Sequence, residues 1–281
     1  MFISPMLLQA AKDNKPFNRK NYVVEPKLDG IRCIVANMDR LQVYTKQNRL
    51  ITNRFPELHK CPLPEGTIVD GELIMLDHRG KPDFEAMSAR LLSSKNRAPV
   101  IFYAFDILRY KGVDVTGLPL LKRKDLLEAA FSENEHYKKI TVFEGKATDH
   151  FRHIQQEGLE GIVIKRSDLK SAYHSGKSTK SWQTVINWIY ADVYIAGFRK
   201  NDYSLLASID AENGFKVPVG IVESGITPMH KKALDSIKRR LVYKENNNFA
   251  YMEPVLMARI KTKSWTKEGK LRSPEFLEFA I

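Results

Sequence analysis

The sequence contains very little cysteine and no long hydrophobic run. Each of these absences excludes certain classes of protein. Its two cysteines, Cys33 and Cys61, are too few for a disulfide framework and belong to no cluster with metal-ligand spacing. No apolar stretch approaches the roughly 20 residues that cross a bilayer. Residues 1–6 are too short for the apolar core of a signal peptide. We therefore expect a soluble, cytoplasmic protein with no membrane partner.

Acidic residues are also in deficit. The 281 residues include 45 Lys and Arg against 33 Asp and Glu, so the formal net charge is +12. The basic residues are dispersed along the chain, which indicates a folded surface that meets a polyanion. A basic surface can also simply keep a protein in solution, so charge alone leaves both interpretations open. The length allows one large domain or two modest domains.

Hydrophobic periodicity predicts short strands and helices over the first two thirds of the chain. Residues 5–12 read as a short helix or a lead-in that covers a site, and residues 167–181 as an exposed polar loop. A helical turn is expected at 54–60, and helices at 82–93, 120–131 and 148–156. Strands are expected at 32–37, 41–46, 66–76, 99–108, 140–143 and 161–165.

The pattern changes near residue 190. Short strands are expected at 192–198, 204–209, 215–221 and 254–261, with a single helix at 227–240. Several short strands with one helix in about 90 residues fit a small closed barrel such as the OB-fold. The predicted fold class is therefore α+β, with antiparallel sheets and helices in a domain over 1–190 and a barrel over 191–281.

One stretch, Glu-Pro-Lys-Leu-Asp-Gly-Ile-Arg at residues 25–32, combines several groups suited to a nucleotide. Lys27 has apolar neighbours, and a partly desolvated amine near other cations has a lowered pKa and becomes a usable nucleophile. The Asp29 carboxylate suits ribose hydroxyls, and Gly30 lets the backbone approach a ligand closely. Arg32 offers a planar fork for a phosphate. The same residues could form a surface turn of mixed charge, so this stretch alone does not identify a nucleotide-binding site.

Three further motifs follow in order: Asp-Gly-Glu72-Leu, Phe105-Asp, and Glu160-Gly-Ile-Val-Ile-Lys165. Together with Lys27-Leu-Asp-Gly, their order and spacing resemble the covalent nucleotidyltransferase superfamily. The resemblance is closest to its minimal ATP-dependent DNA ligases of phage and bacterial type, and it covers nearly the whole chain. The nucleotidyltransferase (adenylation) domain would then be followed by an OB-fold domain.

The resemblance implies a role for each matching residue. Lys27 would attack the α-phosphate of ATP and form a lysyl-AMP intermediate. Glu72 would lie near the nucleoside, Phe105 would stack on adenine, and Glu160 would help to hold Mg²⁺ or Mn²⁺. Other expected nucleotide-binding residues are Glu25, Asp29, Gly30, Arg32, Lys46, Lys165 and Lys180. The expected DNA-binding residues are Arg32, Lys46 and Arg272.

The chain departs from the family pattern at two places in this domain. Lys46 stands in Thr-Lys-Gln-Asn, where the family commonly has Ser-Arg-x-Gly, and lysine lacks the bidentate fork of arginine. The family's Trp-x-Lys-x-Lys aligns with Trp-Gln-Thr184-Val-Ile186, so both phosphate-gripping lysines are missing. Lys165, Lys177 or Lys180 could supply the charge. We favour Lys180, because strand alternation would place Lys165 and Glu160 on opposite faces.

The sequence thus predicts an ATP-dependent DNA ligase that seals 5′-phosphate/3′-hydroxyl nicks in duplex DNA, acting as a monomer. An RNA ligase or an mRNA-capping nucleotidyltransferase would use the same motifs. The missing lysines also fit a ligase homologue that binds nicks but is catalytically weakened.

Overall fold

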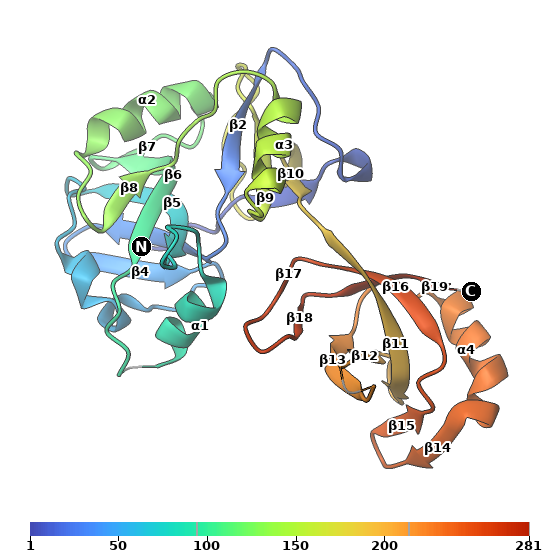
Figure 1. The fold of residues 1–281 in the computed structure, drawn as a ribbon. Coiled ribbons are helices and arrows are strands. Elements are labelled where there is room, and N and C mark those ends of the chain that lie inside the picture. The colour runs from blue at the N-terminus through green and yellow to red at the C-terminus, as the bar shows by residue number, and fades with distance from the viewer. Residues whose placement is uncertain (94, 213, 281) are drawn as a thin grey trace. The chain divides into compact units, whose positions relative to one another are not determined.

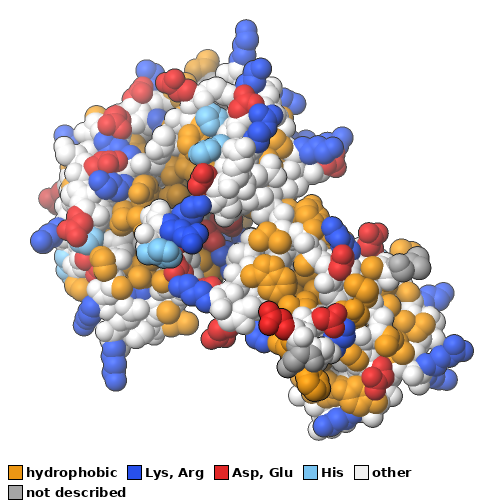
Figure 2. Space-filling view, in the orientation of Figure 1, with side chains coloured by type: hydrophobic (Ala, Val, Ile, Leu, Met, Phe, Trp, Pro, Cys, Tyr) orange, Lys and Arg blue, Asp and Glu red, His pale blue; other side chains and the backbone are white. Residues whose placement is uncertain are grey.

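The computed structural model describes residues 1–93, 95–212 and 214–280 (Figure 1). The chain divides into two compact units, Met1–Asn187 and Trp188–Ile281. This division lies close to the change of pattern expected near residue 190. No described helix is both long enough and apolar enough to cross a membrane. Basic side chains are spread over the visible surface of the first unit rather than confined to one segment of it (Figure 2).

The first unit is built on two sheets. One has four strands in the order β1 (Leu7–Ala10), β10 (Ser178–Ile186), β9 (Gly161–Arg166) and β2 (Tyr22–Lys27). The other runs β4 (Leu41–Thr45), β3 (Ile31–Asn37), β5 (Thr67–Ile74), β6 (Ile101–Tyr110) and β7 (Val113–Asp114), with β8 (Tyr137–Lys139) beside β6.

Among the described residues of the first unit, three helices and three 3-10 turns accompany the two sheets. The helix α3 (Ala147–Gln156) buries Ala147 and Ile154 in a cluster with Val24, Ile162 and Ile164 of the four-stranded sheet. One face of that sheet is therefore covered by α3, and the other face is left for a site. The remaining elements are α1 (Phe84–Leu92), α2 (Leu120–Ala130) and the turns Lys12–Asn14, Thr52–Arg54 and Pro56–His59.

Several segments differ from the sequence-based expectation. The segment 167–181 is not an exposed loop throughout, because Ser171 and Tyr173 are buried and β10 begins at Ser178. The strand β2 was not expected. The lead-in at 5–12 contains the strand β1, not a helix, because the edge of β10 offers it backbone partners: the Ala11 amide donates to Thr184 O at 3.0 Å. The strand expected at 140–143 is instead a crossing between the sheets. The Ile140 amide donates to Ala104 of β6, and the Phe143 amide donates to Val24 of β2, both at 2.8 Å.

The described part of the second unit consists of a curled seven-stranded sheet, a two-stranded sheet of β17 and β18, and one helix. The long strand β11 (Ile189–Arg199) pairs with β12, β15 and β16, and β16 pairs with β19. A bridge between Ser224, just after β13, and Glu275 of β19 brings the two ends of the sheet together. The other elements are β12 (Leu205–Asp210), β13 (Lys216–Val222), α4 (Pro228–Leu241), β14 (Val242–Glu245), β15 (Phe249–Met252), β16 (Met257–Thr262), β17 (Ser264–Trp265), β18 (Leu271–Arg272) and β19 (Glu275–Ala280).

Candidate active site

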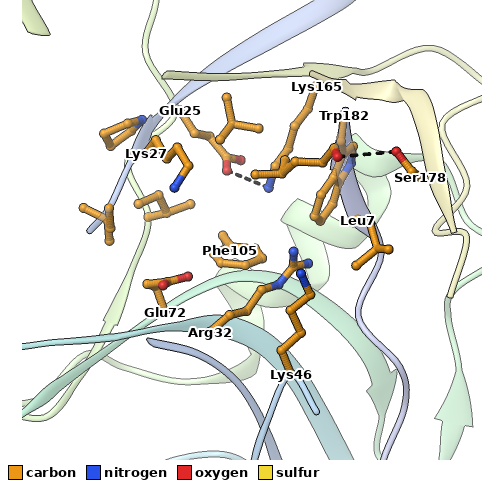
Figure 3. Close-up of a pocket in the computed structure, with 15 residues that line it drawn as sticks. Leu7, Glu25, Lys27, Arg32, Lys46, Glu72, Phe105, Lys165, Ser178 and Trp182 are labelled. Carbon is orange, nitrogen blue, oxygen red and sulfur yellow. Dashed lines mark hydrogen bonds and ion pairs between the residues drawn. The ribbon is translucent and has the colours of Figure 1, made fainter. Parts of the chain in front are cut away.

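A cavity of about 370 Å³ lies between the two sheets of the first unit (Figure 3). Every strand from β1 to β6, together with β9 and β10, contributes to it directly or through the residue that follows. Its lining residues are Leu7, Leu8, Glu25, Pro26, Lys27, Leu28, Arg32, Lys46, Glu72, Phe105, Ile140, Val163, Lys165, Ser178 and Trp182.

The register of the four-stranded sheet explains which side chains reach this cavity. Glu25 of β2 pairs with Val163 of β9, and Lys165 of β9 pairs with Trp182 of β10. Directly paired residues share a face, and alternate residues along a strand return to that face. Glu25 and Lys27 therefore line the cavity, while Val24, one residue before Glu25, points into the cluster under α3.

Lys27 is held at the cavity by an ion pair. Its Nζ lies 2.7 Å from Oε2 of Glu160, and the side chains are 20% and 3% exposed. Glu160 immediately precedes β9, where Gly161 lies so close to β10 that a Cβ would be 2.2 Å from the Val185 oxygen. Only glycine fits there, and this close approach positions the Glu160 carboxylate beside the amine.

Glu25 lies between two ammonium groups. Lys165 Nζ is 2.6 Å from its Oε2, and Lys124 of α2 contacts its other oxygen and donates to Phe105 O at 2.8 Å. Burial lowers the pKa of Lys165 to about 8, although Glu25 opposes that shift. The Lys165 Nζ also lies 4.0 Å from the Trp182 ring centre and 4.5 Å from that of Phe105. The two rings and this cation form one wall.

Arg32 does not present a free fork to the cavity. Its Nε and Nη2 donate to the buried Asp70 carboxylate at 3.0 and 2.6 Å, and Tyr173 Oη donates to the same carboxylate at 2.6 Å. Burial lowers the pKa of Arg32, but the Asp70 charge and hydrogen bond outweigh it, so the net shift is upward. The expected phosphate-binding fork is thus already engaged by Asp70, because β3 and β5 are neighbours in the sheet.

Glu72 stands beside Arg32 in the β3–β5 pairing and faces the cavity. Burial raises its pKa to about 8, against the opposing charges of Lys27 and Arg32. At neutral pH its carboxyl group holds a proton and can donate a hydrogen bond. Glu72 and Glu160 are the acids around Lys27, and no cluster of three or more metal-binding side chains occurs among the described residues. One or two carboxylates completed by phosphate oxygens suit Mg²⁺.

Comparison with known proteins assigns the chain to a family. The model of the ATP dependent DNA ligase domain matches residues 5–185, the part of the chain that builds both sheets and the cavity. The chain belongs to the ATP-dependent DNA ligase family. Members of this family seal nicks through a lysyl-AMP intermediate.

Individual relatives and a solved structure support the assignment. The SPbeta prophage-derived DNA ligase-like protein LigB of Bacillus subtilis (strain 168) is 35% identical, over all of both chains. The DNA ligase of Thermococcus fumicolans is 28% identical, over 99% of this chain and 54% of its own. The crystal structure of the ligase domain of M. tuberculosis LigD matches at a TM-score of 0.60, 26% identical, over 99% and 95% of the two chains.

The structure brings most of the predicted ligase residues together. Lys27, Arg32, Glu72, Phe105 and Lys165 line one cavity, with Glu25 and Lys46, and Glu160 joins through Lys27. Sequence reasoning missed three contributors: Trp182 as a ring of the cavity wall, Lys124 as a partner of Glu25, and Tyr173 as a partner of Asp70. Trp182 belongs to one of the family motifs, but no local signal marked Lys124 or Tyr173.

The structure gives a packing reason for glycine at position 30, which differs from the expected close approach to a ligand. A Cβ there would lie 2.4 Å from Leu73 O and 2.6 Å from the Ile74 side chain, so the glycine permits close packing on β5. Neither Gly30 nor Asp29 lines the cavity. Their predicted contacts with nucleotide stay predictions.

Lys180 lies outside the cavity, which corrects our preference for it over Lys165. It is exposed and lines a separate hollow with Lys12 and Lys15. Strand β10 is irregular here, because Leu7 pairs with Ser178 but Gln9 pairs with Gln183, so simple alternation fails. The alternation rule also did not exclude Lys165 from the cavity, because Glu160 lies before strand β9 and not within it.

Arg272 belongs to β18 in the second unit, where its amide donates to Thr262 Oγ1 at 3.1 Å. Thr262 Oγ1 in turn donates to the Arg272 carbonyl at 2.7 Å, so the backbone at this position is fixed on both sides. Contact of the Arg272 side chain with DNA stays a prediction.

Proposed function

We propose that the first unit, the nucleotidyltransferase domain near residues 1–190, binds ATP in the cavity and that Lys27 is the nucleophile. Its Nζ would form a bond to the α-phosphorus while the bond to pyrophosphate breaks. AMP would then pass to the 5′-phosphate at a nick, and the 3′-hydroxyl would displace it. The observation that supports this most directly is the Lys27–Glu160 pair at the edge of a cavity lined by rings and cations.

Glu160 suits two tasks beside this nucleophile. At 2.7 Å, its carboxylate can take the proton that Lys27 must lose before its amine attacks. Glu160 would hold Mg²⁺ or Mn²⁺ together with triphosphate oxygens, while the protonated Glu72 would donate a hydrogen bond to the nucleotide. The bound ion would neutralise phosphate charge.

Phe105 and Trp182 would receive the adenine. Their rings are 6.0 Å apart at 75° and are held by Lys165 and Arg32. Stacking of a base on such a ring contributes roughly 1–3 kcal/mol. The paired Glu25, Lys124 and Lys165 at the same wall would present hydrogen-bonding groups to the base edge.

Lys46 would supply part of the positive charge that the two lysines of the family motif, absent here, would provide. Lys27, Arg32 and Lys165 each pair with a carboxylate, whereas Lys46 has no ion-pair partner among the described residues. Its ammonium is therefore available to a phosphate of the nucleotide or of DNA.

The second unit would be the OB-fold domain, near residues 191–281, and would bind nicked duplex DNA. The curling of its sheet through the Ser224–Glu275 bridge supports a small barrel. Arg272 would be one of its DNA contacts.

Intact-mass spectrometry after incubation with ATP and magnesium tests this function. The wild-type protein should gain the mass of AMP, and Lys27→Ala should gain none, whereas Lys180→Ala should behave as wild type. An adduct of unchanged yield in Lys27→Ala would overturn the assignment.

One observation supports a second candidate function. Thr184 and Ile186 replace two charged residues on the cavity face of β10, which suits a nick-binding protein of low ligase activity. Absence of an adduct in the wild type, with nicked DNA still bound, would favour that alternative. Radiolabelled ATP and GTP, compared as donors, would separate a capping activity.

A further inference from the structure

A second, strongly basic groove lies on the face of the four-stranded sheet opposite the nucleotide cavity. It consists of two adjoining hollows of about 500 and 260 Å³ that share Phe17, Arg19 and Tyr22. Tyr22 and Val24 of β2 and Gln183 of β10 line it, alternating with the cavity residues Glu25 and Trp182. The sheet therefore separates the groove from the reacting atoms.

The groove has an excess of unpaired positive charge. Six basic side chains line it, against the single acid Asp13. None of the six forms an ion pair with any residue that the structure describes, in contrast to the cations of the cavity. They are Lys12, Lys15, Arg19, Lys20, Lys146 and Lys180.

The loop that supplies most of these cations is fixed at two points. The Asn14 side chain donates to Ile186 O at 2.7 Å and accepts from the Ile186 amide at 2.9 Å, which joins the loop to the end of β10. The Asn18 side chain donates to Thr148 Oγ1 and accepts from the Thr148 amide, at 3.2 and 3.3 Å, which joins it to the start of α3.

Aromatic rings of the groove pack against each other and against one of its cations. Phe17 and Tyr22 meet edge to face at 5.2 Å, and the Arg19 guanidinium lies 5.4 Å from the Phe17 ring centre. A cation ordered by a ring and a pinned loop loses less entropy when it binds a partner. In Figure 2, basic side chains project at the upper right of the first unit, where Figure 1 draws the loop that precedes β2.

We propose that this groove is a second DNA contact, which holds the sugar–phosphate backbone of the duplex flanking the nick. Six preorganised cations with almost no acid match a run of phosphates, and the family's reaction supplies such a polyanion. The inference rests on the proposed function for its substrate. Because the sheet intervenes, the contact raises affinity for DNA and leaves adenylation of Lys27 unchanged. Lys180 thus serves DNA binding, not the nucleotide.

The test compares two triple variants that each remove three positive charges. Lys12→Gln/Lys15→Gln/Arg19→Gln changes the groove, and Arg40→Gln/Lys60→Gln/Arg97→Gln changes exposed basic residues elsewhere on the same unit. Affinity for a nicked duplex with long flanks is measured across a range of salt concentrations. The groove variant should bind roughly tenfold more weakly or worse, and its salt slope should be smaller by about one for each phosphate that it no longer neutralises.

The control variant should change affinity far less, and both variants should form the AMP adduct at the wild-type rate. Shortening the flanks should reduce wild-type affinity to that of the groove variant. Equal weakening in both variants, or an unchanged salt slope in the groove variant, would overturn the proposal. Loss of the adduct in the wild type would instead count against the proposed function, so the two failures are distinguishable.

Discussion

Glu72 is a buried acid that keeps its proton at neutral pH, because burial outweighs the nearby cations Lys27 and Arg32. An acid whose pKa is raised on folding makes the folded state less stable as pH rises. The loss begins near its ordinary pKa of 4.5, where the unfolded chain releases the proton, and ends near its folded pKa of about 8. The same proton lets Glu72 donate to a nucleotide without repelling phosphate.

Glu72→Gln should therefore gain stability relative to the wild type across this pH window. The difference in free energy of unfolding should grow by up to about 1.4 kcal/mol per pH unit, the slope for one proton. Urea denaturation at several pH values between 4.5 and 8 measures it. Parallel stability curves for the two proteins would show that Glu72 titrates normally.

The effect of a substitution at Thr184 on adenylation depends on the face of the sheet that its side chain occupies. Thr184 pairs with Val163, which lines the cavity, so a longer cationic side chain there would extend along the cavity wall. Thr184→Lys should speed single-turnover adenylation by roughly tenfold, less than the roughly hundredfold effect of removing a preorganised donor. Gln183→Lys adds the same charge on the groove face and serves as the control. Equal rates in both variants would rule out a position-specific role.

At the scale of elements, α2 is anchored by a fully buried ion pair. Arg123 Nε and Nη2 donate to the Asp106 carboxylate of β6 at 2.7 and 2.8 Å, and neither side chain is exposed. Nη1 of Arg123 also donates to Ser171 O at 3.0 Å. The pair fixes β6, and with it Phe105, against the helix that supplies Lys124 to Glu25.

Arg123→Leu should destabilise the protein by about 3–5 kcal/mol, because it leaves the Asp106 charge buried without a partner. The midpoint of urea unfolding gives this value. Lys122→Ala, which removes an exposed pair with Asp125 at 3.8 Å, should change the free energy of unfolding by less than about 1 kcal/mol. A small effect of Arg123→Leu would mean that Asp106 finds water or another donor.

At the scale of the whole molecule, the two units have separate apolar cores. The first unit packs clusters around Val35, Phe102 and Ile164, and the second packs its own around Val193 and Ile260. Each unit therefore has what a domain needs to fold alone.

A fragment of residues 1–187 should fold alone and unfold in one cooperative transition. Circular dichroism of a thermal melt tests this, and limited proteolysis of the full chain should cut first near the division at Asn187 and Trp188. A fragment that melts without a cooperative transition would show that the first unit depends on the second.

The sequence by itself determined the family, the order of the motifs, the positions of α1 to α4 and those of about half of the strands. Lys27, Glu72, Phe105 and Glu160 were predicted because the motifs are local, and the strands that carry Glu72 and Phe105 were expected from hydrophobic periodicity. A change of pattern within the sequence also predicted a division near residue 190, and the two compact units divide between Asn187 and Trp188.

Only the tertiary structure decided which charges are free. Asp70 engages the Arg32 fork because β3 and β5 are neighbours, and Glu25 pairs with Lys124, which is distant along the chain. The irregularity of β10 turns Lys180 away from the cavity, and this irregularity occurs where β10 pairs with β1. From the sequence alone, the segment of β1 reads as a short helix or a lead-in that covers the site. Ion pairs and strand register arise from contacts between distant segments, and no window of sequence contains them.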